Sequence, residues 1–142
     1  MKTSGSNNLL HTIEQHIKQS PASVFLMKDF ADLGSSRQIS NVLKKLIRQC
    51  QLAKIGYGLY AKAYLSPYLS TPLLVDGFCY VAREALDRLQ VRWEPGSAEK
   101  EYNEGKTQQV PTQHVVRLKS RLRRVIRYEG CQLYYEKGIN AR

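Results

Sequence analysis

The stretch from Ser35 to Gln51 constrains this chain most, because its apolar residues recur at the spacing of a single helical face. These apolar residues are Ile39, Val42, Leu43, Leu46 and Ile47. Residues at i, i+3, i+4, i+7 and i+8 lie on the same side of an α-helix, so the stretch is predicted to be an amphipathic helix with a buried face. Ser35 followed by Gln38 predicts a capping box at its start.

The opposite face of this predicted helix is polar and contains no acidic residue. Its members are Arg37, Gln38, Ser40, Asn41, Lys44, Lys45 and Arg48. Arg and Lys match guanine edges, Asn and Gln match adenine edges, and cations neutralise phosphate, so the face suits the reading of DNA bases. A solvated face that happens to be basic is the commoner explanation of such a pattern, and the neighbouring elements must decide between the two.

The charge of the whole chain favours a polyanionic partner. Lys and Arg number 22 against 12 Asp and Glu in 142 residues, a net charge of +10. Residues 1–63 hold nine basic and three acidic residues (+6), residues 64–112 five and seven (−2), and residues 113–142 eight and two (+6). Such an excess points first to nucleic acid, then to an anionic membrane or an acidic protein.

The elements around the basic helix predict a winged helix-turn-helix domain over residues 1–63. Residues 1–7 are expected to be loose, and a short amphipathic helix is expected from Asn8 to about Pro21. An extended piece at 24–25 and a compact helix at 27–33 follow, with Gly34 at the C′ position. Two strands at 52–55 and 59–62 then predict a hairpin. This order is that of a helix-turn-helix followed by a wing.

Residues 64–72 carry two prolines and are predicted to be a linker to a second unit, residues 73–142. This unit is expected to be a small α+β domain with a mainly antiparallel sheet, so the fold class of the chain is α+β. Its predicted elements are a long helix at 73–90, a strand at 91–93, a helical turn at 98–102, strands near 113–118, 122–128 and 131–136, and a turn at Glu129-Gly130.

A second basic surface is predicted near the end of the chain. It consists of Arg117, Lys119, Arg121, Arg123, Arg124 and Arg127, with no acidic residue among them. A strand with a buried face often carries Arg outward for solubility, and that explanation is about equally good. The complete set of predicted DNA contacts is Ser35, Ser36, Arg37, Gln38, Ser40, Asn41, Lys44, Lys45, Arg48, Lys54, Tyr57, Lys62, Arg117, Lys119, Arg121, Arg123 and Arg124.

Motifs of catalysis and cofactor binding are missing from the sequence. There is no GxxxxGK loop and no GxGxxG, and the three histidines are not spaced as metal ligands. The acidic residues at 94–104 could hold Mg²⁺, although a solvated loop is the better interpretation. We therefore expect no enzyme, metal or cofactor. With three scattered cysteines, no secretory signal and no apolar run of membrane-spanning length, a cytoplasmic protein without membrane contact is expected.

A family resemblance lies in residues 24–61. It rests on Phe25, Asp29-Phe30, Leu33-Gly34, Leu43, Leu46 and Gly58-Leu59-Tyr60. With these residues the stretch resembles the N-terminal winged helix of AbiEi-type antitoxins of bacterial type IV toxin–antitoxin systems. Residues 95–112 resemble the C-terminal unit of a small antitoxin-like subfamily. Cys50 departs from the pattern, because a Gly is expected there; a positive φ would strain Cys50.

The resemblance implies a transcriptional repressor that binds double-stranded DNA at the promoter of its own operon. It also implies an antitoxin, active in phage defence, that neutralises a nucleotidyltransferase-like toxin without requiring a stable complex. Three alternatives remain open: a solitary regulator on a mobile element, a binder of structured RNA, and a protein-interaction module. In the last, residues 73–142 would bind a partner, with Trp93, Tyr128, Tyr134 and Tyr135 as anchors or simply as core aromatics.

Overall fold

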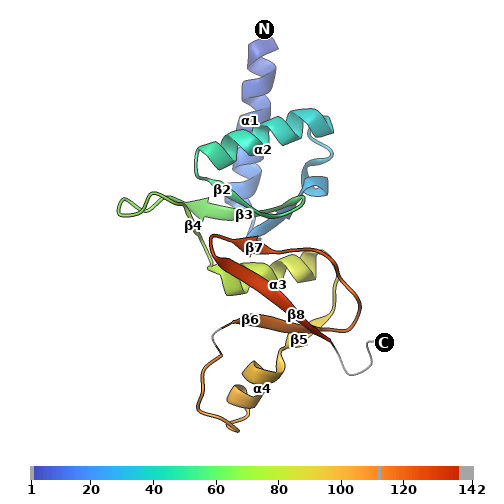
Figure 1. The fold of residues 1–142 in the computed structure, drawn as a ribbon. Helices are drawn as coiled ribbons and strands as arrows, with labels where there is room; N and C mark the ends of the chain where they lie inside the picture. Colours follow the sequence, from blue (N-terminus) through green and yellow to red (C-terminus); the bar gives the residue numbers. More distant parts are fainter. Residues whose placement is uncertain (1, 112, 138–142) are drawn as a thin grey trace.

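The computed structural model describes residues 2–111 and 113–137 and has a mixed α+β fold, with two α-helices at one end, a third beside the two sheets in the middle and a fourth at the other end (Figure 1). The elements are α1 (Lys2–Gln19), β1 (Val24–Leu26), the 3-10 helix η1 (Met27–Phe30), α2 (Ser36–Arg48), β2 (Leu52–Gly56), β3 (Leu59–Tyr64), β4 (Leu73–Leu74), α3 (Phe78–Arg88), β5 (Trp93–Pro95), α4 (Ser97–Asn103), β6 (His114–Leu118), β7 (Arg127–Tyr128) and β8 (Cys131–Lys137).

The first sheet is antiparallel, has the order β1-β3-β2 with β4 paired to the end of β3, and is buried on both faces. Alternate residues of β1 serve the two faces. Phe25 joins the cluster under α1 and α2, whereas Val24 and Leu26 join the cluster on the other side. The apolar face predicted for residues 35–51 packs here, with Leu43 and Leu46 fully buried. The apolar face of α2 thus packs against the first sheet, which holds the helix in place.

The second sheet has the order β5-β6-β8-β7 and lies beside α3, with β7 above that helix and β5 and β6 below it (Figure 1). The strands β6 and β8 are parallel, because the chain crosses over between them instead of turning back directly. The larger hydrophobic cluster takes Ala61 and Leu74 from the first sheet, Leu86 from α3, and Val116 and Leu133 from the second sheet. One core therefore spans residues on both sides of segment 64–72.

Polar contacts of α3, and of the segment just before it, also join these residues to the N-terminal part. The Glu84 Oε2 atom accepts hydrogen bonds from the backbone N–H of Ser23 at 2.7 Å and of Val24 at 2.8 Å. The buried Ser23 hydroxyl donates to Asp76, and Arg88 forms an ion pair with Asp29. These contacts add directional hydrogen bonds to an otherwise apolar interface. Hydrogen bonds to charged groups are among the stronger ones.

Several expectations for the N-terminal part need correction. The helix α1 begins at Lys2, so residues 2–7 are not loose, and residue 1 lies outside the described residues. Once Ile13 and Ile17 are buried, each further helical residue adds a hydrogen bond without a new nucleation cost. The compact helix is a 3-10 turn that ends at Phe30, because the Ala31 and Leu33 N–H groups bond to Lys28 and Phe30, three residues back.

The C-terminal part also differs from its prediction in three places. The helix expected at 73–90 begins only at Phe78, because Leu73–Leu74 pairs with β3 and Gly77 turns the chain with φ +81°. The strand expected at 91–93 is β5, Trp93–Pro95. The strand expected at 122–128 is limited to Arg127–Tyr128, since the preceding residues cross the end of the β2–β3 hairpin. The helical turn at 98–102 and the Glu129-Gly130 turn are confirmed.

Residues 65–72 connect two paired strands, β3 and β4, and extend from the molecule as an arm (Figure 1). Tyr68 in this arm is 91% exposed. No helix among the described residues is long and apolar enough to cross a lipid bilayer.

Candidate nucleic-acid interface

The helix α2 presents a polar face opposite its buried one. The exposed residues along it are Ser35, Ser36, Arg37, Gln38, Asn41, Lys44, Lys45 and Arg48, and Ser40 is half-buried. The predicted capping box is present: the Gln38 N–H donates to the Ser35 hydroxyl at 3.2 Å, and the Gln38 side-chain oxygen accepts from the Ser35 N–H at 3.0 Å. The helix start is therefore fixed by its own side chains, and every predicted contact on α2 lies on or beside this polar face.

The end of α2 is closed by Cys50, which has a φ of +63°. The Cys50 N–H bonds to the Ile47 carbonyl and the Gln51 N–H bonds to the Leu46 carbonyl, which is the Schellman arrangement of a helix C-terminus. Glycine is the usual residue at this position, so Cys50 carries backbone strain, as the resemblance implied it would if its φ were positive. This turn leads directly into β2 and so sets the position of the hairpin beside α2.

The hairpin formed by β2 and β3 carries three of the predicted contacts in different environments. Lys54 is exposed, and Tyr57 at the turn is 85% exposed. Lys62 instead is half-buried, and its ammonium group donates to the Ser20 carbonyl at 2.6 Å. Lys54 and Tyr57 are therefore available to a ligand, whereas Lys62 fastens the end of α1 to the first sheet.

The predicted second basic surface divides in two. Arg117 is half-buried, with Nη2 at 3.2 Å from Glu136 and Nη1 at 3.7 Å from Glu94. Lys119 lies 3.2 Å from Glu94. The pKa of Glu94 is lowered mainly by a hydrogen bond from Lys119. The pKa of Glu136 is lowered mainly by a hydrogen bond from Ser97. These two basic residues thus neutralise carboxylates of the protein and are poor candidates for phosphate contact.

Of the remaining residues of that surface, Arg124 and Arg127 lie near the hairpin. Arg121, Arg123 and Arg127 are exposed. Arg124 is half-buried and donates from Nη1 to the Tyr57 carbonyl at 2.7 Å. Arg127 and Lys54 line one shallow depression of about 460 Å³, which Glu129 also borders. The structure therefore brings β7 next to β2, although 73 positions separate Lys54 from Arg127.

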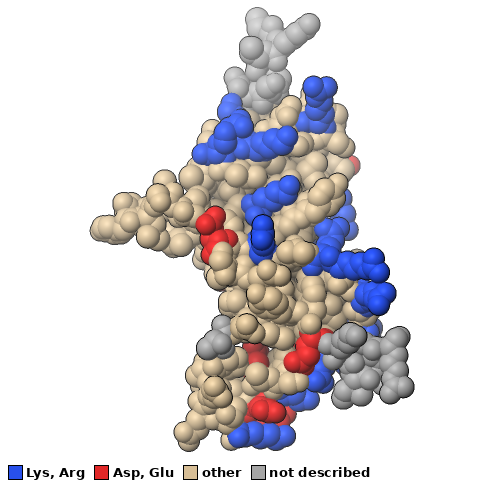
Figure 2. Space-filling model, in the orientation of Figure 1, with Lys and Arg blue, Asp and Glu red and all other residues tan. Residues whose placement is uncertain are grey.

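The distribution of charge over the surface follows this division (Figure 2). Lys and Arg gather on the part of the visible face that carries α2, and further basic groups continue below it towards the segment between β6 and β7. In the lower part of the molecule, around α4, acidic and basic side chains are mixed. Basic side chains of α2 and of the segment between β6 and β7 are thus both visible on this face.

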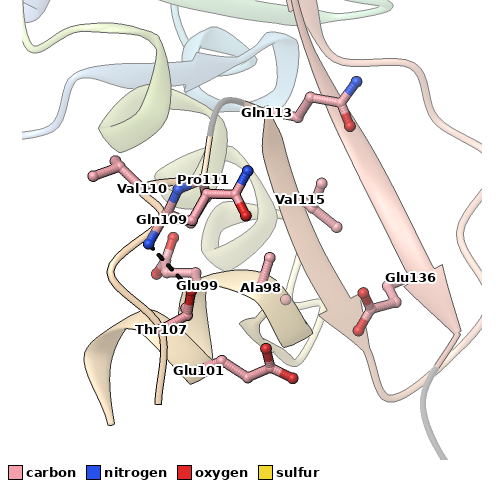
Figure 3. Close-up of a pocket in the computed structure, with 11 residues that line it drawn as sticks. Ala98, Glu99, Glu101, Thr107, Gln109, Val110, Pro111, Gln113, Val115 and Glu136 are labelled. Carbon is pink, nitrogen blue, oxygen red and sulfur yellow. Dashed lines mark hydrogen bonds between the residues drawn. The ribbon is translucent and has the colours of Figure 1, made fainter. Parts of the chain in front are cut away.

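A cavity of about 330 Å³ lies between α4 and the residues that follow it (Figure 3). Its carboxylates are largely engaged, because Glu99 pairs with Arg83 at 2.6 Å and Glu136 accepts from the Ser97 hydroxyl at 2.6 Å. No group of three His, Cys, Asp or Glu that could hold a metal ion was found among the described residues.

The aromatic residues considered as protein-binding anchors serve mainly inside the fold. The Tyr128 hydroxyl donates to the Pro72 carbonyl at 2.6 Å, and that of Tyr135 to the Arg124 carbonyl at 2.7 Å. Burial raises the pKa of both phenols. The Trp93 indole N–H donates to Asp87 at 2.8 Å, and only Tyr134, at 46% exposure, faces solvent substantially.

The hairpin turn is held by a contact that the sequence did not predict. The contact of Arg124 with the Tyr57 carbonyl joins residues 67 positions apart. The pair of glycines around Tyr57 was the available signal, because glycine in a strand or turn often marks a close approach of another backbone. The partner in that approach could not be read from the sequence.

Comparisons with protein-family models, curated proteins and solved structures gave no match for this chain.

Proposed function

We propose that the chain is a sequence-specific, double-stranded DNA-binding repressor of its own operon, and that residues 1–63 act as a winged helix-turn-helix. The observation that carries the proposal is the exposed, acid-free face of α2, whose opposite face is buried on the first sheet. An α-helix is about 10–12 Å in diameter with its side chains, so one held by its apolar side fits the major groove, which is about 12 Å wide.

The residues of α2 divide into two roles in this proposal. Arg37, Gln38 and Asn41 lie in its N-terminal half and read base edges, since recognition helices contact bases with their N-terminal residues. Ser35, Ser36 and Ser40 support them with hydroxyl groups. Lys44, Lys45 and Arg48 contact phosphates, as does Lys54 on the hairpin, and Tyr57 approaches the adjoining groove. Lys62 is left out, because its ammonium group is bound to Ser20.

The exposed Arg121 and Arg123 extend the phosphate contacts beyond α2. A net charge of +10, with Lys and Arg gathered over α2 on the face shown in Figure 2, also raises the rate of encounter with DNA. Arg117 and Lys119 are excluded from the contact set, because Glu94 and Glu136 neutralise them.

The direct test measures binding of the full chain to a duplex that carries its own promoter, by fluorescence anisotropy at several salt concentrations. For Z phosphate contacts, log K falls with log salt at a slope of about −0.9Z. A competing duplex of unrelated sequence and a competing RNA duplex are the controls. Equal competition by the unrelated DNA would refute sequence specificity, and stronger competition by the RNA would favour the structured-RNA alternative.

The antitoxin role rests on the resemblance to AbiEi-type proteins alone. Co-expression of the chain with a nucleotidyltransferase-like toxin encoded beside it should restore growth if that role is correct. A triple variant, Arg37→Ala with Lys44→Ala and Lys45→Ala, should abolish operator binding but keep the rescue, if the two roles use different surfaces. Failure of the wild-type chain to rescue growth would leave a solitary regulator as the proposal.

A protein-interaction module is the second candidate, and the arm at 65–72 is the observation that favours it. Residues 64–75 contain no charged side chain, and Tyr64, Leu65, Leu69 and Val75 are each about half exposed. An uncharged apolar projection is typical of protein contacts and does not suit phosphate. Replacement of Tyr68 and Leu69 by Ser should abolish toxin neutralisation under this alternative and leave operator affinity unchanged.

A further inference from the structure

The segment 119–126 crosses from β6 to the end of the β2–β3 hairpin, where β7 begins. It is held at several points although it forms no strand. Ile126 is fully buried, Leu122 packs against the larger hydrophobic cluster, and the Tyr135 hydroxyl donates to the Arg124 carbonyl at 2.7 Å. The segment is therefore a fixed part of the fold at the place where it meets the hairpin.

Two contacts join this segment to the hairpin turn. The guanidinium group of Arg124 donates from Nη1 to the Tyr57 carbonyl at 2.7 Å. At Gly56, a Cβ atom would lie only 2.8 Å from the Val125 carbonyl oxygen, a distance that real Cβ atoms do not tolerate. The absence of a side chain at Gly56 is thus what allows the backbone of Val125 to approach so closely.

The composition of the hairpin turn explains why these contacts matter for its order. Tyr57 is 85% exposed and stands between Gly56 and Gly58, and Gly58 has a φ of +65°. Glycine has more backbone freedom than any other residue, so a turn of this composition loses much conformational entropy when it is ordered. A turn that is already ordered in the unbound protein binds more tightly, because less of that entropy is lost on binding.

We propose that Arg124 is a positioning residue, which together with the Val125 carbonyl and Gly56 fixes the hairpin turn so that Tyr57 is pre-ordered for nucleic acid. The proposal rests on the function proposed above, and it changes the role of Arg124 from a phosphate contact to an internal brace. It also makes the N-terminal binding surface depend on the C-terminal part of the chain.

The brace is tested first without DNA, by amide hydrogen exchange and ¹⁵N relaxation at Tyr57 and Gly58. Arg124→Ala should increase exchange and fast motion at these two amides, while Arg123→Ala, which removes the same charge one residue away, should not. Arg124→Lys should restore part of the order, because an ammonium group also donates to a carbonyl. Unchanged exchange in Arg124→Ala would overturn the proposal, and this result does not depend on DNA binding.

The second test separates positioning from phosphate contact. Arg124→Ala should weaken operator binding roughly two- to tenfold with little change in the salt slope, as expected for the lost ordering of one or two groups. Arg123→Ala should reduce the steepness of that slope by about 0.9. A slope change in Arg124→Ala equal to that in Arg123→Ala would identify Arg124 as a phosphate contact and refute its positioning role.

A double-mutant cycle completes the test. If Arg124 acts through the turn, its replacement should have little further effect once Tyr57→Ala has removed the side chain that the turn presents, and full additivity would contradict the proposal. Gly56→Ala should mimic Arg124→Ala, because its Cβ displaces Val125. If the wild-type chain binds no DNA, the proposed function and the binding part of this inference both fail. If the wild-type chain binds DNA but Arg124→Ala and Arg123→Ala have the same effects, the inference alone fails.

Discussion

Arg37 is the residue on which the proposed base reading depends most directly. It is exposed in the first turn of α2, and the capping box between Ser35 and Gln38 fixes the helix there. We expect Arg37→Ala to cost about 1–3 kcal/mol of operator-binding free energy and to relax specificity at one base pair. The measurement is the affinity for operator variants that differ in single base pairs. Lys100→Ala, which removes a charge on α4, should leave the preference unchanged, and an unaltered profile in Arg37→Ala would place the recognition face elsewhere.

Two non-glycine residues, Cys50 and Gln90, end helices with φ near +60°. A left-handed backbone costs roughly 1–2 kcal/mol per residue for an L-amino acid, and glycine avoids most of that cost. Gln90→Gly should therefore raise the free energy of unfolding by about 0.5–1 kcal/mol, since Gln90 is exposed and its side chain contributes little packing. Cys50→Gly should gain less, because Cys50 is half-buried. Urea denaturation measures both, with the alanine variants as controls that keep the strain.

At the scale of elements, the contact between α3 and β1 is the clearest target. Glu84 receives both the Ser23 and the Val24 N–H groups, and Ser23 is only 4% exposed. Glu84→Ala leaves these two donors without their partner, so it should destabilise the fold by about 2 kcal/mol. Glu84→Gln keeps an oxygen in place and should lose about half as much. Equal unfolding midpoints for wild type and Glu84→Ala would mean that water replaces the carboxylate without cost.

The elements that the sequence predicted correctly are those with a strong local signal. The helix at Ser36–Arg48 follows from its periodicity and its cap, and the turn at Glu129-Gly130 from its residue types, both with positive φ. The strand expected at 122–128 failed for a non-local reason. Its alternating Arg and apolar residues fit a strand, yet Arg124 and Val125 are used by a turn more than 60 positions earlier.

The candidate site shows the same limit. Exposure of Arg37, Lys44 and Lys45 followed from the helical period, which assigns each residue to a face. The internal roles of Lys62, Arg117 and Arg124 could not be predicted, because each depends on an oxygen atom brought close by the tertiary fold. A basic residue in a sequence reveals its charge but not whether the protein itself neutralises that charge.

At the scale of the whole molecule, the two signs of charge have separate uses. Carboxylates are engaged with basic partners around the second sheet, whereas cations such as Lys44 on α2 and Arg121 are exposed. Acid therefore affects the two regions differently. Protonation removes the partners of Arg117 and Lys119 and at the same time raises a net charge that is already +10, so self-repulsion increases.

The pKa values of Glu94 and Glu136 set the direction of this pH dependence. Both lie below the ordinary value of 4.5 in the folded chain, the first mainly through the hydrogen bond from Lys119 and the second mainly through that from Ser97. A lowered pKa means that the ionised carboxylate stabilises the fold. This contribution is complete above pH 4.5 and is lost as the pH falls through the lower folded values.

We expect thermal unfolding midpoints to be level near pH 6 to 7 and to fall progressively below about pH 4.5. Glu136→Gln should lower the midpoint at pH 7 and make it less sensitive to acid, because the titrating group is gone while an acceptor for Ser97 remains. Glu101→Gln is the matched control, since Glu101 is exposed and lies on α4. A pH profile of Glu136→Gln parallel to that of the wild type would show that the ion pairs of the second sheet do not govern acid stability, and that the acid response comes from the excess of positive charge alone.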